Sequence, residues 1–163
     1  HDRSVHFKGQ GLAKHRQYWH DVIGYNYRMT NICAAIGLAQ LENIEKVLIE
    51  KKRVADTYRK LLENTAVVFH NPIGNDVYHS YWMCSILTQD AKQRDVLRTH
   101  LEKEGIETRP LFYPVHTMPM YSAQYQKHPV AENLGWRGIN LPSYPGLKTE
   151  EIEFICKKIQ EVL

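Results

Sequence analysis

The stretch of sequence that decides the fold is GYNYRMTNICAAIGLAQL, residues 24–41. Thr30 belongs to the residue class that caps helix N-termini, and residues 32–41 place apolar side chains on every face of a helix. We therefore expect a helix over residues 32–41. A helix that is apolar all round must be covered on all sides, either in the core of a monomer or between its own domain and a partner chain.

Just before this helix, residues 24–29 place two phenols, an amide and a guanidinium within four positions. Arg28 presents forked donors that suit phosphate or carboxylate, and Asn26 adds an amide. A helix N-terminus contributes backbone N–H groups and positive potential. The residues alone leave two interpretations open: an anion site, or a surface loop in which Arg28 makes an ordinary salt bridge.

The rest of the chain predicts a small sheet packed with helices. Charged, amphipathic sequence from Asn43 to Leu62 predicts a helix that prolongs the first helical segment. We expect strands over residues 66–69, 78–88 and 106–109. On the second of these strands, Tyr81 and Trp82 are expected to belong to the core rather than to a site. Three strands interleaved with helices after a long helical segment indicate an α+β fold with a small, mainly antiparallel sheet.

Helices and turns are expected between and after these strands. Apolar spacing over residues 96–101 predicts a helix that ends at Gly105, and a short helix is expected over residues 129–134. Thr149 is expected to cap a final helix with one apolar stripe, made of Ile152, Ile155, Cys156 and Ile159. Turn residues are Asn71-Pro72 and Gly74-Asn75, and the prolines that predict an irregular loop are Pro110, Pro114 and Pro119.

The composition is that of about one globular domain, with 43% hydrophobic residues, 24% charged residues and a net charge of +3. Basic and acidic residues are interspersed, so nucleic acid is not an expected partner. No apolar run approaches the roughly 20 residues that cross a bilayer, and the polar N-terminus is unlike a secretory signal. Cys33, Cys84 and Cys156 are widely spaced and the histidines show no His-Glu-x-x-His pattern. We therefore expect reduced thiols, no metal site, no membrane partner and a cytoplasmic location.

These motifs together resemble the DegT/DnrJ/EryC1/StrS family of sugar aminotransferases, which are fold-type-I pyridoxal-phosphate enzymes. The likeness is carried by residues 24–42 and by four later segments, Tyr78–Trp82, Gly105–Pro110, Tyr113–His116 and Leu141–Pro145. Within the family, the chain most resembles members that aminate a GDP-4-keto-6-deoxymannose at C4 with glutamate as amino donor, in lipopolysaccharide O-antigen biosynthesis. The resemblance implies a homodimer, pyridoxal 5′-phosphate as cofactor, and a nucleotide-linked keto sugar and glutamate as substrates.

The same resemblance assigns roles to individual residues. It implies that Asn26 and Arg28 reach into the neighbouring subunit's active site, where Asn26 bonds the cofactor phosphate. It also implies that Arg109, Tyr113 and His116 lie in a loop that lines the substrate pocket, a cation with aromatic groups being suited to a sugar nucleotide. For His116, the alternative is an interface or loop histidine that is bonded to backbone.

The resemblance further divides the chain into three parts. Residues 1–29 would be the tail of the large cofactor-binding domain and a cross-subunit loop. Residues 30–64 would form a helical connection at the interface, and residues 65–163 would form the small C-terminal domain of the fold-type-I enzyme.

Transamination needs a lysine that bonds to the cofactor aldehyde and a carboxylate on the pyridinium nitrogen. In the family that lysine precedes a Gly-Glu-Gly-Gly run, whereas Lys8 here precedes Gly9-Gln10-Gly11, which matches the stretch after the lysine region. No catalytic residue is therefore assigned, and we expect a C-terminal portion of the enzyme that is inactive alone. Two alternatives stay open: a related ketodeoxysugar dehydratase with histidine in place of the lysine, and a non-catalytic dimerisation and substrate-recognition module.

Overall fold

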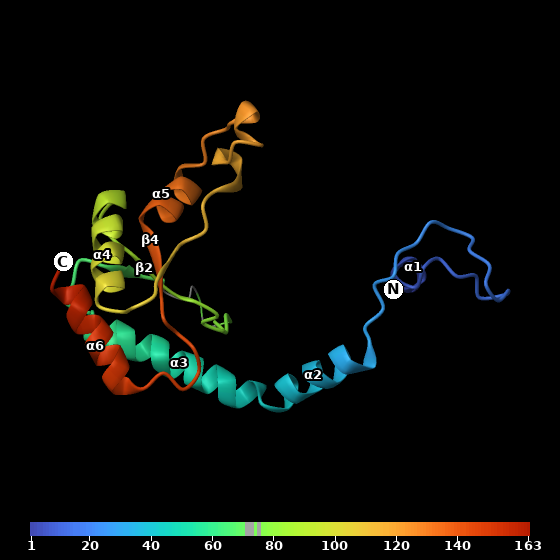
Figure 1. Ribbon diagram of the computed structural model, residues 1–163, viewed down its shortest axis with the longest axis horizontal. Coiled ribbons are helices and arrows are strands. Elements are labelled where there is room, and N and C mark those ends of the chain that lie inside the picture. The colour runs from blue at the N-terminus through green and yellow to red at the C-terminus, as the bar shows by residue number, and fades with distance from the viewer. Residues whose placement is uncertain (71–73, 75) are drawn as a thin grey trace. The chain divides into compact units, whose positions relative to one another are not determined.

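A computed structural model describes residues 1–70, 74 and 76–163 of the chain (Figure 1). The chain forms two compact units, His1–Ile44 and Glu45–Leu163. The turn expected at Asn71-Pro72 and Asn75 lies outside the described residues. Among the helices that the structure describes, none combines the length and apolar character needed to cross a membrane.

The first unit consists of two helices, α1 (Asp2–Lys8) and α2 (Asn31–Glu42), joined by an irregular segment. Thr30 caps α2 as predicted, because its Oγ1 accepts a hydrogen bond from the Cys33 N–H at 3.2 Å. No residue of α2 is buried, and Ile32 and Leu41 are 75% and 67% exposed. This chain does not cover α2 on all sides, so the alternative in which α2 is the central helix of a monomeric core is wrong.

The second unit contains a four-stranded sheet of β1 (Val68–Phe69), β2 (Cys84–Leu87), β3 (Arg109–Pro110) and β4 (Gly138–Leu141). The strand order is β1-β2-β4-β3 and every pair is antiparallel, which confirms the α+β class. Three strands were expected; the fourth, β4, lies in the sheet interior with all its residues buried. The sequence does not predict a buried strand here, because Asn140 is polar. The buried amide is satisfied: it accepts from Ser85 Oγ at 2.6 Å and donates to the Pro110 carbonyl at 3.2 Å.

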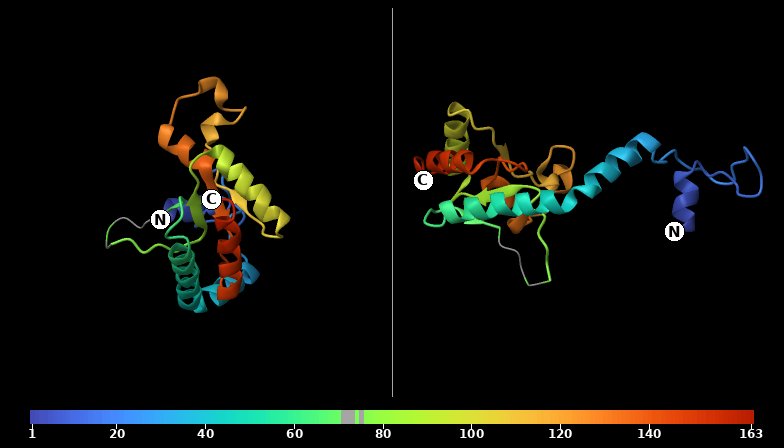
Figure 2. Two further views of the ribbon diagram at one scale, coloured as in Figure 1. Left: turned by 90° about the vertical axis from the view of Figure 1, so that its left-hand side faces the viewer. Right: turned by 90° about the horizontal axis from the view of Figure 1, so that it is seen from below.

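Four helices and two short 3₁₀ turns complete the second unit. The helices are α3 (Ile44–Leu61), α4 (Ala91–Lys103), α5 (Pro129–Arg137) and α6 (Thr149–Gln160), and the turns are η1 (Val115–Thr117) and η2 (Ser122–Gln124). Helix α6 ends beside the end of α3, where Gln160 Nε2 donates to the Leu61 carbonyl at 3.0 Å (Figure 2). One core joins α3, α4, α6 and the sheet; its fully enclosed members include Val54, Tyr58, Ile86, Leu97, Leu101, Ile139, Ile152 and Ile159.

Local signals at the helix ends were predicted with mixed success. Gly105 follows α4 with a φ of +76°, the left-handed conformation that glycine adopts without strain, as expected. The apolar stripe of α6 is buried as predicted. Thr149, however, is the first helical residue and not the cap. The cap is Lys148, whose N–H donates to Glu151 Oε2 at 2.8 Å.

The strand expected over residues 78–88 forms only at Cys84–Leu87. Tyr81 interrupts the extended chain with a φ of +48°, and Trp82 is 71% exposed. The prediction that Trp82 is a core residue is therefore wrong, whereas Tyr81 is partly buried and packs against the core. The Trp82 carbonyl bonds to Lys51 Nζ of α3 at 2.9 Å, in place of a strand partner.

Candidate functional site

The Gly24–Met29 segment is held in extended form by the last residues of α1 and the residues that follow them. The Tyr25 N–H donates to the Phe7 carbonyl at 2.7 Å and the Tyr27 N–H to the Lys8 carbonyl at 2.9 Å, with a bridge between Gly9 and Asn26. Gly24 is needed for this pairing, because a Cβ there would lie 2.3 Å from the Gly11 nitrogen. Backbone hydrogen bonds therefore fix the segment before α2 begins.

Alternation along this extended segment separates its side chains into two sets. Tyr25 and Tyr27 stack on each other, with ring centroids 5.5 Å apart and planes 11° from parallel. The other set pairs directly: Arg28 Nε donates to Asn26 Oδ1 at 3.3 Å, and Arg28 Nη2 donates to Gln10 Oε1 at 3.2 Å. Gln10 was not anticipated from the sequence, since its contact with Arg28 joins positions 18 apart.

Both acceptors of Arg28 are neutral amides. Among the residues that the structure describes, no carboxylate forms an ion pair with this guanidinium, so the salt bridge considered above does not form and the positive charge is not neutralised. An exposed guanidinium held beside an amide can bind a phosphate through charge-assisted hydrogen bonds. These residues therefore fit the phosphate group of a cofactor such as pyridoxal phosphate.

The three predicted substrate residues lie on β3 and the loop after it. Arg109 is exposed, pairs with Glu107 Oε1 at 3.2 Å and lines a cleft of about 720 Å³ beside Tyr144 and Phe154. Tyr113 packs on the Trp136 ring at 5.2 Å, and His116 lines a separate hollow beside Met120 and Tyr121. Arg109 and His116 thus line different cavities, and the role of the three residues as substrate contacts stays a prediction.

His116 belongs to a polar cluster that the sequence did not reveal. Glu132 Oε1 accepts hydrogen bonds from His116 Nε2 at 3.1 Å, the Tyr125 hydroxyl at 2.8 Å and the His128 N–H at 2.9 Å. These three bonds, that of His116 first, lower the pKa of Glu132 to about 2. The bond to a side chain also means that His116 is not bonded only to loop backbone. The available signal was an acidic residue in the first turn of a helix that starts with Pro129.

Comparison with known proteins places the chain in a family. Residues 1–160 match the DegT/DnrJ/EryC1/StrS aminotransferase family. A GDP-perosamine synthase from Escherichia coli O157:H7 is 64% identical over 160 residues, which are 98% of this chain and 43% of that protein. A GDP-perosamine synthase from Vibrio cholerae is 44% identical over 163 residues, covering 98% of this chain and 44% of that protein. The chain thus spans less than half the length of these relatives.

The fold agrees with this placement. The structure superposes on the aminotransferase TlmJ from Streptoalloteichus hindustanus with a TM-score of 0.89 at 20% identity, over 99% of this chain and 44% of that one. The family match, over residues 1–160, includes the Gly24–Met29 segment and all but the last three residues of the second unit. The chain belongs to the DegT/DnrJ/EryC1/StrS aminotransferase family, whose aminotransferases use pyridoxal phosphate.

Proposed function

We propose that this chain supplies the cross-subunit segment and the small domain of a nucleotide-sugar aminotransferase. The enzyme aminates a GDP-linked 4-keto-6-deoxy sugar at C4 with glutamate as amino donor. Two relatives named GDP-perosamine synthase, at 64% and 44% identity, support the substrate class. The observation that carries the proposal is the pair of Asn26 and Arg28, an exposed cationic group bonded only to neutral amides.

Each part of the chain has a role in this proposal. Asn26 and Arg28 bind the cofactor phosphate across a homodimer interface, and the uniformly apolar helix α2 packs against the partner subunit. Pyridoxal phosphate, when bound, supplies the electron sink for moving an amino group from glutamate to the keto carbon. Arg109, Tyr113 and His116 contact the sugar nucleotide from the small domain. The parts are residues 1–29, 30–64 and 65–163, and the enzyme acts in the cytoplasm.

The 163-residue chain alone is proposed to be inactive, because none of its lysines stands in the family's cofactor-bonding context. The test is to mix the purified chain with pyridoxal phosphate, reduce with borohydride and map the modified lysines by mass spectrometry. We expect no lysine to be modified stoichiometrically. Specific modification of Lys8 would contradict this assignment.

The activity is tested on the full-length protein that contains this chain, supplied with glutamate and GDP-4-keto-6-deoxymannose. We expect a 4-amino sugar and one equivalent of 2-oxoglutarate. Loss of the sugar hydroxyl without incorporation of nitrogen would favour the dehydratase alternative instead. If a folded protein loaded with pyridoxal phosphate forms neither product, both enzyme activities are rejected. The non-catalytic recognition module is then the remaining alternative.

A further inference from the structure

A second cavity in the Glu45–Leu163 unit is lined by residues other than Arg109, Tyr113 and His116. It encloses about 460 Å³ between α3, the irregular segment before β2 and the chain after β3. Its aromatic side is formed by Phe69, Trp82 and Phe112, and its polar side by Arg59, His70 and His79. A cavity of this size, with large aromatic walls and few polar groups, is typical of a site for a small planar ligand.

The aromatic side presents uncovered ring faces. Trp82 and Phe112 stack with centroids 6.3 Å apart and planes 24° from parallel, yet they are 71% and 67% exposed. The segment of Trp82 is tied to α3, because Lys51 Nζ donates to the Trp82 carbonyl at 2.9 Å and also to the Ser143 carbonyl. Fixed aromatic faces stack well on a nucleobase, since every base has a planar π-face.

The polar side offers hydrogen-bond donors. His79 Nδ1 accepts the Tyr81 N–H at 2.9 Å, which leaves the proton of the neutral ring on Nε2. Burial, together with the nearby His70 and Arg59, lowers the pKa of His79 and keeps the ring neutral. Tyr81, between these groups, holds a φ of +48°, a strained backbone conformation of the kind that persists at ligand sites.

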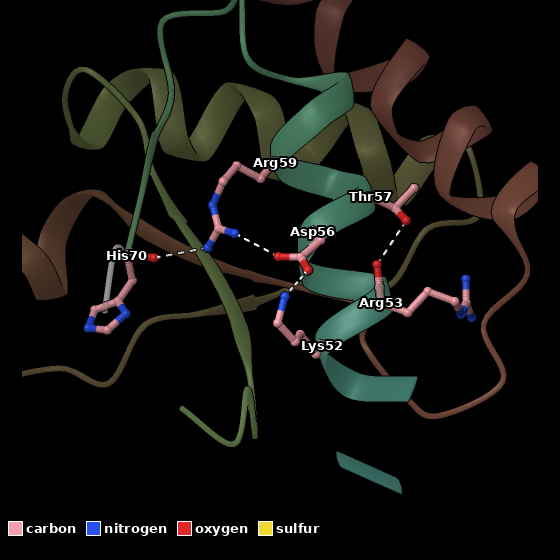
Figure 3. A network of polar contacts seen from close by, with 6 residues as sticks. All are labelled: Lys52, Arg53, Asp56, Thr57, Arg59 and His70. Atoms are coloured by element: carbon pink, nitrogen blue, oxygen red, sulfur yellow. Dashed lines mark hydrogen bonds and ion pairs between the residues drawn. The ribbon is translucent and has the colours of Figure 1, made fainter. Parts of the chain in front are cut away.

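Arg59 adds a cation whose charge is only partly balanced (Figure 3). Its Nη1 pairs with Asp56 Oδ1 at 2.8 Å, but Asp56 also pairs with Lys52, so two cations share one carboxylate. Its Nη2 reaches the His70 carbonyl at a long 3.5 Å, and its Nε is enclosed without a hydrogen-bond partner among the described residues. The weakly held Nη2 of Arg59 can therefore donate to an acceptor in the cavity, whereas the enclosed Nε is not accessible to a ligand.

We propose that this cavity binds the base of the nucleotide sugar, with the purine stacked on Trp82 and Phe112 and its acceptor edge facing His79 and Arg59. Guanine presents two adjacent acceptors, O6 and N7, which match two donors. The inference rests on the proposed function for its ligand class, a guanine nucleotide. It adds a base-binding site to the contacts expected from Arg109, Tyr113 and His116.

The test follows the indole N–H resonances of the three tryptophans while the chain is titrated with GDP, guanosine or pyrophosphate. We expect GDP and guanosine to shift the Trp82 resonance saturably and pyrophosphate to leave it in place. Trp82→Leu and Phe112→Leu should each weaken GDP binding about tenfold or more, the loss of one base–aromatic stack. The matched control is Trp19→Phe, which removes an indole outside this cavity and should leave the affinity unchanged.

Three results would overturn the site: no shift of Trp82 up to millimolar GDP, a shift that pyrophosphate alone reproduces, or unchanged affinity after Trp82→Leu. The amination assay on the full-length protein separates this failure from failure of the proposed function. If Trp82→Leu aminates the sugar with an unchanged KM, the base-binding site is rejected and the proposed function still stands. If guanosine binds at Trp82 but the protein does not aminate the GDP-linked sugar, the proposed function is rejected and the base-binding site still stands.

Discussion

The two units use apolar side chains in opposite ways. The hydrophobic core cluster lies in Glu45–Leu163, from Val54 to Ile159, whereas the first unit buries the small side chain of Ala13. In His1–Ile44, neither α1 nor α2 has a buried residue, although α2 carries apolar side chains on every face. A one-sided apolar pattern such as that of α6 therefore indicates a helix with its own core, whereas an all-round apolar pattern indicates a helix that another surface must cover.

The largest effect that tests this comparison comes from matched leucines on two helices. Leu97 of α4 is fully buried and Leu38 of α2 is 58% exposed. Leu97→Ala should lower the free energy of unfolding by about 2–5 kcal/mol, because it removes packed methyl groups and leaves a cavity. Leu38→Ala should change it by no more than about 0.5 kcal/mol, as for an exposed position. Urea denaturation of the dilute chain measures both.

Equal losses in the two variants would break the comparison, since α2 would then belong to the same cooperative core. The comparison is supported if only Leu97→Ala lowers the free energy of unfolding and Leu38→Ala instead weakens self-association of the chain. Sedimentation at several chain concentrations supplies that second measurement.

The next effect concerns the polar residues of the first unit. In the full-length protein, Asn26→Ala should weaken retention of pyridoxal phosphate by about 1.5–3 kcal/mol, the value of a hydrogen bond to a charged group. The control is Asn133→Ala, which removes an amide of α5 that accepts a long hydrogen bond of 3.4 Å from Arg137 Nη1. Fluorescence of the bound cofactor during dialysis measures retention. Unchanged retention in Asn26→Ala would show that the Gly24–Met29 segment has only a structural role.

Local patterns made much of this fold predictable. The Thr30 cap, the positive φ of Gly105 and the stripe of α6 each depend on neighbours within a few positions, and each was predicted and found. The interior strand β4 was not, because its four residues carry no strong alternation and the hydrogen-bond partners of Asn140, Ser85 and Pro110, lie 55 and 30 positions away. Long-range partners of this kind leave no mark on a local pattern.

The candidate site likewise contains residues that the sequence predicted and residues that it did not. Asn26 and Arg28 were singled out by their residue types, and the structure brings them into contact. Gln10, Glu132 and the exposed Trp82 were missed, since each owes its place to a contact or a backbone turn specific to the folded chain. Trp82 in particular follows the left-handed Tyr81, and residue type alone predicted a strand there.

A smaller effect is expected from hydroxyl groups in the two units. Tyr58 is fully buried and its hydroxyl donates to the Pro142 carbonyl at 3.0 Å, while Tyr27 is 73% exposed. Burial raises the pKa of Tyr58, so the hydroxyl stays a donor across the usual pH range. Tyr58→Phe should lower the free energy of unfolding by about 1 kcal/mol, and Tyr27→Phe should leave it unchanged. A loss in Tyr27→Phe of the same size would assign a hidden contact to the first unit.

The smallest expected effect is local and depends on pH. The folded pKa of Glu132 is about 2, below the ordinary value of 4.5, so its ionised form is the one that the hydrogen bonds stabilise. That stabilisation is complete above about pH 4.5 and disappears as the pH falls toward 2, because protons then bind the folded and unfolded chains alike. The protection factors of the His128 and Tyr125 amides, which are exchange rates corrected for the intrinsic effect of pH, should therefore fall as the pH drops through this window in the wild-type chain.

In Glu132→Gln the carboxylate is absent, so the protection factors at His128 and Tyr125 should already be lower at pH 6 and should change less between pH 5 and pH 2. The matched control is Glu153→Gln, an exposed residue of α6, which should keep the wild-type profile. If Glu132→Gln instead retains the wild-type window, another group must hold residues 115–128. The loop would then depend on packing, as the core of the second unit does, and not on one carboxylate.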